Sequence, residues 1–118
     1  MDILERSRQF LDSLGFHTES KGSINLPFLI GNGKMIRVSI IATNNRELRI
    51  QAENVLKGGM SQANELNRTL HGGIRCVVTS DERIDLLCDL PEYITTGDMF
   101  ERAIVESLFR IYFIAEIC

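Results

Sequence analysis

The sequence lacks a hydrophobic run long enough to cross a membrane. No stretch of about 18 apolar residues occurs in the 118-residue chain, so no transmembrane helix is expected. The opening segment MDILERSRQF is amphipathic and carries acidic residues, whereas a signal peptide has a basic start and an apolar run. These absences predict a cytoplasmic protein that does not bind membranes.

An excess of positive charge is also missing. The chain has 13 Lys and Arg residues against 16 Asp and Glu residues, which gives a net charge of −3 with the two signs interspersed. Nonspecific nucleic-acid binding needs a basic footprint on the protein. We therefore expect no nucleic-acid partner.

Recognisable enzyme motifs are absent. The sequence contains no G-x-S-x-G, no P-loop, no G-x-G-x-x-G and no H-E-x-x-H. The two histidines, His17 and His71, and the scattered thiols do not have the spacing of a zinc site. The sequence therefore predicts a protein that is not an enzyme, with no catalytic residues, no cofactor and no metal.

What remains is the composition of an ordinary globular domain. Hydrophobic residues make up 44% of the chain and charged residues 25%, both typical of soluble proteins. A chain of this length buries roughly two-thirds of its unfolded surface. We expect one domain, residues 1–118, with its own core.

The first segment has helical periodicity. Asp2 can cap the helix, and Gly15 follows its last turn, where a left-handed residue is needed. Phe16 can then fold back onto that turn. One apolar stripe is formed by Ile3, Leu4, Ser7, Phe10, Leu11 and Leu14.

Three strands with period-two alternation are expected next, at residues 24–30, 35–43 and 47–55. The segments GNGK and NNR mark tight turns between them, the second because asparagine tolerates positive φ. Pro27 has no N–H group, so its strand belongs at a sheet edge or meets its neighbour through its other side. The pattern predicts an antiparallel meander with one wet face.

A short helix capped by Ser61 should follow, then a hairpin at residues 74–79 and 83–90, and a last helix that begins near residues 95–98. Asp98 with Glu101 fits the acidic end of a capping pattern at that last helix. The fold class is therefore α+β: helix, three-strand antiparallel meander, helix, two-strand hairpin and helix.

Asn67 lies on the apolar side of the short helix, between Ala63 and Leu70. A buried amide must find hydrogen-bond partners, and the Gly72-Gly73 turn that follows offers free backbone groups. We interpret Asn67 as a structural residue that pins the helix end to the start of the hairpin.

Cys76 and Cys88 fall on the same face of the predicted hairpin. A hairpin loop of either three or five residues keeps them on that face, and five residues would place the thiols opposite each other. A redox pair is one hypothesis. The stronger interpretation is that both are small buried hydrophobic residues, because no C-x-x-C and no flanking histidine lowers a thiol pKa. All three cysteines are expected to be reduced.

The last helix carries two apolar stripes. The first should lie on the sheet and consists of Phe100, Ala103, Ile104, Leu108, Ile111 and Ala115. The second lies roughly opposite on the helix and consists of Val105, Phe109, Tyr112 and Phe113. An apolar second face must be covered too. We predict that it binds another chain or forms a homodimer; the alternative is that the first helix covers it.

The segment ANELNRTLHGGIRCVVTSDERIDLLCDLP resembles the YbjN family, which has a helix with Asn-x-x-Asn and then two strands, the second ending in Asp-Leu-Pro. Asn64, Asn67, Asp89, Leu90 and Pro91 match that pattern. The closing TTGDMFERAIVESLF is similar to the final helix of the family. One departure is that the region after the first helix has few aromatic residues. The wider fold is shared with single-domain type III secretion chaperones.

This resemblance implies a function rather than a mechanism. YbjN relatives are described as sensory-transduction regulators without known catalytic residues, and the chaperones bind an extended segment of a secreted partner. Fold alone does not transfer that activity. The leading prediction is a non-enzymatic protein-binding domain, either a YbjN-like regulator or a secretion-chaperone-like module. The alternative is a small-molecule-binding or thiol-redox domain that uses the Cys76/Cys88 hairpin.

Overall fold

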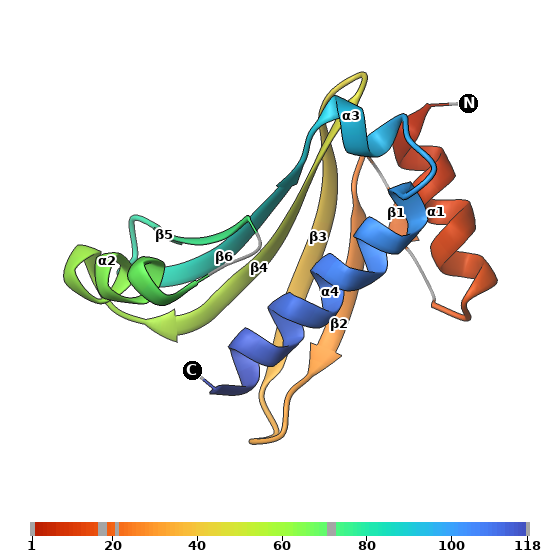
Figure 1. Cartoon of the computed structure of the whole chain (residues 1–118). Helices are drawn as coiled ribbons and strands as arrows, with labels where there is room; N and C mark the ends of the chain where they lie inside the picture. The colour runs from red at the N-terminus through yellow and green to blue at the C-terminus, as the bar shows by residue number, and fades with distance from the viewer. Residues whose placement is uncertain (1, 17–18, 21, 71–72, 118) are drawn as a thin grey trace.

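The computed structural model describes residues 2–16, 19–20, 22–70 and 73–117. They form one antiparallel sheet of six strands in the order β1-β2-β3-β4-β6-β5, crossed by a long C-terminal helix (Figure 1). The strands are β1 (Glu19–Ser20), β2 (Ile24–Leu29), β3 (Met35–Asn44), β4 (Glu47–Lys57), β5 (Ile74–Val78) and β6 (Arg83–Leu90). The helices are α1 (Ile3–Ser13), α2 (Met60–Thr69), α3 (Glu92–Thr95) and α4 (Phe100–Ile117). The predicted α+β fold class is confirmed.

One face of the sheet forms the core. The register places Ile40 opposite Ile50, Ile50 opposite Cys88, and Cys88 opposite Ile74, and all four are buried. Because side chains alternate across a strand, the other residues of these strands face outward. The alternation that predicted the strands therefore gives a single buried layer, continuous from β2 to β5.

The other face is mostly polar, as the alternation predicted. Asp89 on β6 accepts hydrogen bonds from Arg49 at 2.8 Å and from Arg75 at 3.3 Å. The hydrogen bond from Arg49 holds the pKa of the Asp89 carboxyl below its usual value. These groups are partly exposed, so the ion pairs contribute little to stability.

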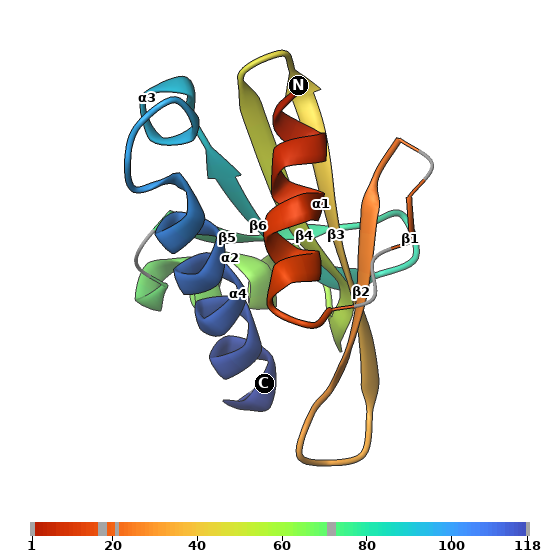
Figure 2. The ribbon, with the colours of Figure 1, turned by 90° about the vertical axis from the view of Figure 1, so that its right-hand side faces the viewer.

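The helices α1 and α4 cover the apolar face, and Figure 2 shows them side by side in front of the strands. Of the first predicted stripe of α4, only Ala103 is not fully buried. The guanidinium of Arg6 on α1 lies 5.0 Å from the centre of the Phe100 ring on α4, a cation–π contact. This contact joins the first and last helices where they cross the sheet.

The ends of α1 are those that the sequence predicts. The Asp2 carboxylate accepts a hydrogen bond from the Glu5 N–H at 2.8 Å, which caps the first turn. Gly15 adopts a φ of 92°, which favours glycine because it has no Cβ. The N–H of Phe16 then reaches back to the Leu11 carbonyl at 3.2 Å.

A bulge bends β4 where its register with β6 shifts between Ala52 and Leu56. Asn54 has a φ of 53° there, so the asparagine with positive φ lies in this bulge and not in the NNR turn. The buried Asp85 carboxylate accepts hydrogen bonds from the Asn54 N–H and from the Gln51 side chain, both at 2.8 Å. The Lys34 amine donates to the carbonyls of Asn54 and Val55 at 2.7 and 3.2 Å.

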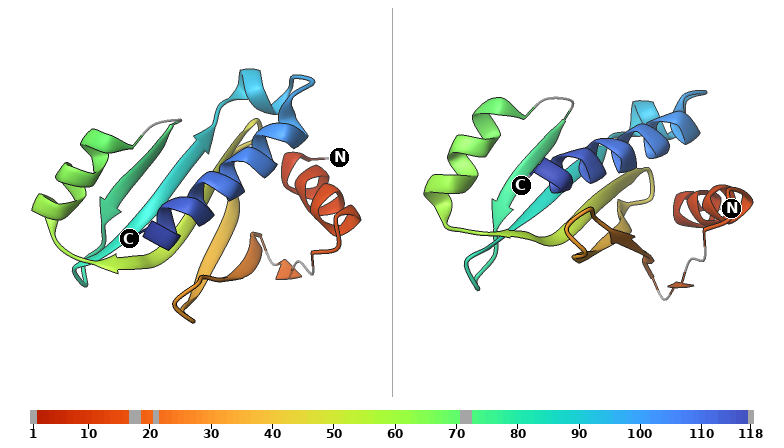
Figure 3. Two further views of the ribbon diagram at one scale, coloured as in Figure 1. Left: turned by 60° about the horizontal axis from the view of Figure 1, so that its bottom comes forward. Right: turned by 90° about the horizontal axis from the view of Figure 1, so that it is seen from below.

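Helix α2 lies beside β5 at one end of the sheet, while α1 lies at the other end with α4 between them (Figure 3). The Asn67 side-chain amide donates to the Cys76 carbonyl at 3.0 Å and accepts from the Cys76 N–H at 2.6 Å. The predicted pinning role is confirmed, with β5 as the partner. The prediction that Asn67 is buried is wrong, because the residue as a whole is exposed.

Two local predictions are corrected, and one strand is added. Helix α2 begins at Met60 with Gly59 as its cap, so Ser61 lies inside the first turn. The Gln62 side chain instead accepts a hydrogen bond from the Gly59 N–H at 2.8 Å. The segment after β6 first forms the separate short helix α3, and α4 begins only at Phe100. Strand β1 was not predicted, because its two residues carry no periodicity.

Candidate partner-binding surface

An open apolar groove of about 420 Å³ lies between the C-terminal end of α1, β2 and the middle of α4. Every described residue that lines it is hydrophobic, aromatic or proline. The lining residues are Leu11, Leu14, Phe16, Pro27, Phe28, Leu29, Val105, Leu108, Phe109 and Tyr112. Such a groove can bind apolar groups but supplies few hydrogen-bonding groups for a polar substrate.

The first wall is the end of α1. Leu11 is fully buried beneath it, while Leu14 and Phe16 are 52% and 39% exposed. The left-handed Gly15 turns the chain between these two side chains, so that both contribute to the groove. The sequence features that end the helix therefore also build this rim.

Strand β2 supplies the second wall. Its partner β1 pairs only with Ile24 and Asn25. From Leu26 onward, β2 has a strand neighbour on one side only, β3, within the described part of the chain. Pro27 lies in this free stretch, as its missing N–H predicted. The edge leaves Leu29 61% exposed, so the groove is bordered by an unpaired strand.

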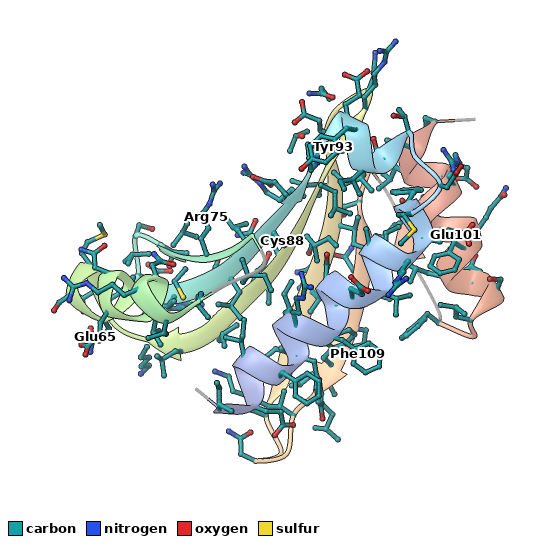
Figure 4. The ribbon with its side chains drawn as sticks, in the orientation of Figure 1. Glu65, Arg75, Cys88, Tyr93, Glu101 and Phe109 are labelled. Atoms are coloured by element: carbon teal, nitrogen blue, oxygen red, sulfur yellow. The ribbon has the colours of Figure 1, made fainter. Side chains whose placement is uncertain are left out.

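Helix α4 forms the third wall with part of the predicted second stripe. Val105 and Tyr112 are partly buried and line the groove. Phe109 is 60% exposed and stands at the rim, whereas Phe113, 63% exposed, lies outside the groove. Figure 4 shows Phe109 on the flank of α4 away from α2. The four residues are thus neighbours, but only three of them, Val105, Phe109 and Tyr112, line the groove between α1 and β2.

Aromatic contacts connect the walls. The rings of Phe28 and Tyr112 meet edge to face with centres 6.2 Å apart. The rings of Phe109 and Phe113 stack at 6.4 Å with an interplanar angle of 27°. Ring pairs at these separations stabilise their arrangement beyond the area that they bury. The first pair packs β2 against α4, and the second holds two aromatic rings together along α4.

Glu116 holds the last turn of α4 against the turn between β2 and β3. Its carboxylate accepts a hydrogen bond from the Gly31 N–H at 2.6 Å. A second hydrogen bond, from the Tyr112 hydroxyl, raises the pKa of that tyrosine above its usual value. The contact fixes the distance between α4 and β2, and so the width of the groove at this end.

Sequence reasoning missed most of this surface. It predicted the α4 residues from helical spacing but interpreted Leu14, Phe16, Pro27 and Phe28 only as parts of their own elements. One signal was available: Pro27 marked β2 as an edge strand with an apolar neighbour on each side.

The hairpin does not place Cys76 and Cys88 opposite each other. The loop has three residues, with the Thr79 N–H bonded to the Arg83 carbonyl at 2.8 Å. Cys76 therefore lies opposite Leu86, and Cys88 opposite Ile74. Both cysteines are buried and neither forms a disulfide, and the Cys88 thiol donates to the Ser107 hydroxyl at 3.5 Å. This geometry fits the interpretation as small core residues.

The described residues form neither a metal-binding cluster nor a membrane-spanning helix. Among the described residues, no three His, Cys, Asp or Glu side chains are grouped so as to hold a metal ion. Both histidines and Cys118 lie outside the described residues. None of the described helices is long and apolar enough to cross a membrane.

Comparison with known proteins identifies the fold. No family model matches the chain, and no curated protein of similar sequence was found. A chain in the crystal structure of the ExsC–ExsE complex is 16% identical, with a TM-score of 0.66 over 99% of this chain and 93% of the other. The fold is that of the type III secretion chaperones.

A second structure supports this assignment. The Yersinia pestis type III secretion chaperone SycH, crystallised in complex with a stable fragment of YscM2, has a TM-score of 0.57 and 18% identity. The match covers 92% of this chain and 96% of that one. At such identities the similarity shows the fold alone. The YbjN resemblance stays a prediction, since neither structure belongs to that family by its description.

Proposed function

We propose that this protein is a non-enzymatic, cytoplasmic binding module of the type III secretion chaperone type, which holds an apolar segment of another protein in the groove. The observation that carries the proposal is the groove itself, which is open to the surface and, in the described part of the chain, lined by apolar and aromatic side chains. Exposed apolar surface of this kind is costly unless a partner covers it.

The scarcity of polar groups in the groove favours a segment of a protein chain over a small molecule as its ligand. A site for a small molecule combines an apolar pocket with several converging polar groups. Among the described lining residues, the Tyr112 hydroxyl is the only side-chain polar group, and it already bonds Glu116. Both structural relatives were crystallised as complexes with protein partners. The structural similarity supports a chaperone role over that of a YbjN-like regulator.

Site-directed photocrosslinking tests the proposal. A photoreactive phenylalanine analogue replaces Leu14 at the groove rim, and in a matched control it replaces Tyr93, which is 77% exposed on α3 outside the groove. In cells that carry the gene, we expect the Leu14 probe to label a contiguous stretch of another protein and the Tyr93 probe to leave it unlabelled. Equal labelling from both positions, or none from Leu14, would contradict the proposal.

A substitution checks the same surface without a probe. Leu14→Asp places a charge at the rim of the groove, where the side chain is half exposed, so the fold should survive. We expect the partner identified by crosslinking to stop co-purifying with this variant. Tyr93→Asp is the control and should retain the partner.

A further inference from the structure

A polar depression lies where the middle of α1 meets the start of α4. Its open volume is about 580 Å³, and its described lining residues are Arg6, Gln9, Phe10 and Ser13 of α1 and Glu101 of α4. All of them except Phe10 carry polar or charged side chains. Figure 4 shows Glu101 at the end of α4 that lies beside α1, with Phe109 farther along the helix.

The depression adjoins the apolar groove on both helices. On α1, Phe10 of the depression lies one turn before Leu14 of the groove, and on α4, Glu101 lies one turn before Val105. Residues four apart share a face of a helix, and four residues rise by only about 6 Å. A residue bound beside Leu14 and Val105 can therefore extend its side chain into the depression.

Two opposite charges line this depression without pairing. Within the described part of the chain, the side chains of Arg6 and Glu101 form no hydrogen bond or ion pair, either with each other or with another residue. The Arg6 guanidinium instead lies over the Phe100 ring, 5.0 Å from its centre. A guanidinium in this position keeps its N–H groups free to donate, and the Glu101 carboxylate keeps both oxygens free to accept.

A group that both donates and accepts can bond to the two charged side chains at once. The carboxamide of asparagine or glutamine has two N–H donors and a carbonyl acceptor, so its carbonyl can accept from Arg6 while its N–H groups donate to Glu101. A cation in the depression would be attracted by Glu101 but repelled by Arg6, and an anion the reverse. Hydrogen bonds to charged groups are roughly twice as strong as those between neutral groups, which favours the amide.

We propose that the protein segment bound in the groove places an asparagine or glutamine side chain in this depression, between Arg6 and Glu101. This site rests on the proposed function, because the apolar residues of the segment hold it beside Leu14 and Val105. The groove supplies affinity through the burial of apolar groups, while the depression selects the sequence of the segment. A residue without the amide leaves both charged groups without a hydrogen-bond partner from the segment, which is how a polar site rejects an analogue.

Selection from a phage-displayed library of random peptides tests the amide preference. The wild-type chain should enrich peptides in which Asn or Gln lies next to apolar residues, and alanine in place of that amide residue should weaken peptide binding about tenfold. Arg6→Glu leaves two carboxylates in the depression and should shift the position to Lys or Arg. Glu101→Arg leaves two guanidinium groups and should shift it to Asp or Glu. Both residues are exposed, so circular dichroism should stay unchanged.

The double variant Arg6→Glu, Glu101→Arg separates an amide from a charged ligand. A carboxamide can rotate by half a turn and exchange its donor and acceptor sides, so this variant should again enrich Asn and Gln. Glu65→Arg makes the same change of charge at an exposed position of α2 and is the matched control, which should keep the wild-type preference. Enrichment of charged residues by the wild-type chain or by the double variant, or a shift with Glu65→Arg, would overturn the proposal.

Leu14→Asp separates this proposal from the proposed function. Enrichment of apolar peptides that disappears with Leu14→Asp, without a preference for Asn or Gln beside them, would remove the amide site and leave the groove as a binding site. A wild-type chain that enriches no apolar peptides, or a Leu14→Asp variant that enriches the same ones, would overturn the proposed function and the amide site with it.

Discussion

At the scale of single residues, Asn67 completes an edge strand. In an antiparallel strand, the N–H and C=O of one residue point to the same side. Cys76 turns both groups away from β6, and the Asn67 amide bonds both of them. An edge strand with free backbone groups invites pairing with other chains. The side chain therefore takes the place of a neighbouring strand at this one position.

Asn67→Ala should lower the free energy of unfolding by about 0.5–1.5 kcal/mol, because two hydrogen bonds to backbone groups are lost. The loss is moderate because Asn67 is exposed and water can reach the freed groups. Asn64→Ala, an exposed position on the same helix, is the control and should stay within about 0.5 kcal/mol. Urea unfolding measures both; an unmoved midpoint for the Asn67 variant would refute the role.

Gly31 is required for space and not for its backbone conformation. A Cβ added there would lie 2.8 Å from a Glu116 carboxylate oxygen, so Gly31→Ala must displace the carboxylate that bonds the Gly31 N–H. We expect a loss of about 0.5–1.5 kcal/mol in stability. In a Glu116→Ala background the same substitution should cost almost nothing. Additive losses in this double-mutant cycle would show that the contact contributes nothing.

At the scale of elements, two charged side chains form hydrogen bonds with the backbone N–H and carbonyl groups of the β4 bulge. The Asp85 carboxylate accepts a hydrogen bond from the Asn54 N–H, and the Lys34 amine donates to the carbonyls of Asn54 and Val55. A bulge interrupts the ladder and leaves such groups unpaired. The two side chains thus supply the hydrogen bonds that β6 cannot.

Asp85→Leu should therefore destabilise the protein by about 1–3 kcal/mol, because the Asn54 N–H and the Gln51 side-chain amide lose the buried carboxylate that accepts their hydrogen bonds. Asp85→Asn should lose less, since its carbonyl can still accept from Asn54. Glu53→Leu, exposed on the same bulge, is the matched control. Chemical denaturation would rank the three variants, and equal losses for Asp85→Leu and Glu53→Leu would disprove the role.

Periodicity explains which elements the sequence could predict. The helices α1 and α4 and the strands β2 to β6 each repeat their apolar pattern often enough to be recognised. The two residues of β1 and the four of α3 are too short to show a period. The β4 bulge also escaped, because the carboxylate that holds it lies 31 residues away along the chain.

The residues of the candidate site also differ in whether the sequence could predict them. The α4 stripe follows from helical geometry within one segment, so Val105, Phe109 and Tyr112 were predicted. Leu14 and Pro27 join them only because the sheet brings α1 and β2 beside α4. Such a juxtaposition depends on tertiary packing, which local patterns do not encode. A groove built from three distant segments therefore needs the folded structure to be recognised.

At the scale of the whole molecule, the helices differ in how many residues they bury. Helix α4 buries six residues and α1 three, whereas α2 buries only Ala63. The molecule measures 41 × 29 × 23 Å, with α2 at one end of its sheet (Figure 3). Regions with few buried apolar contacts open first under native conditions. We therefore expect α2 to unfold locally while the rest of the fold remains intact.

Native-state hydrogen exchange tests this expectation. Amides within α2 should exchange on the order of tenfold or more faster than those in the middle of α4. The Cys76 amide should be protected although it faces the edge of β5, because it donates to Asn67. Asn67→Ala should remove that protection and speed exchange throughout α2, while leaving α4 unchanged. Ile74, whose N–H faces the same edge by alternation, is the internal control and should exchange at the same rate in both proteins. Equal protection of α2 and α4 would mean that the two helices unfold together, and that α2 is held by more than its contact with β5.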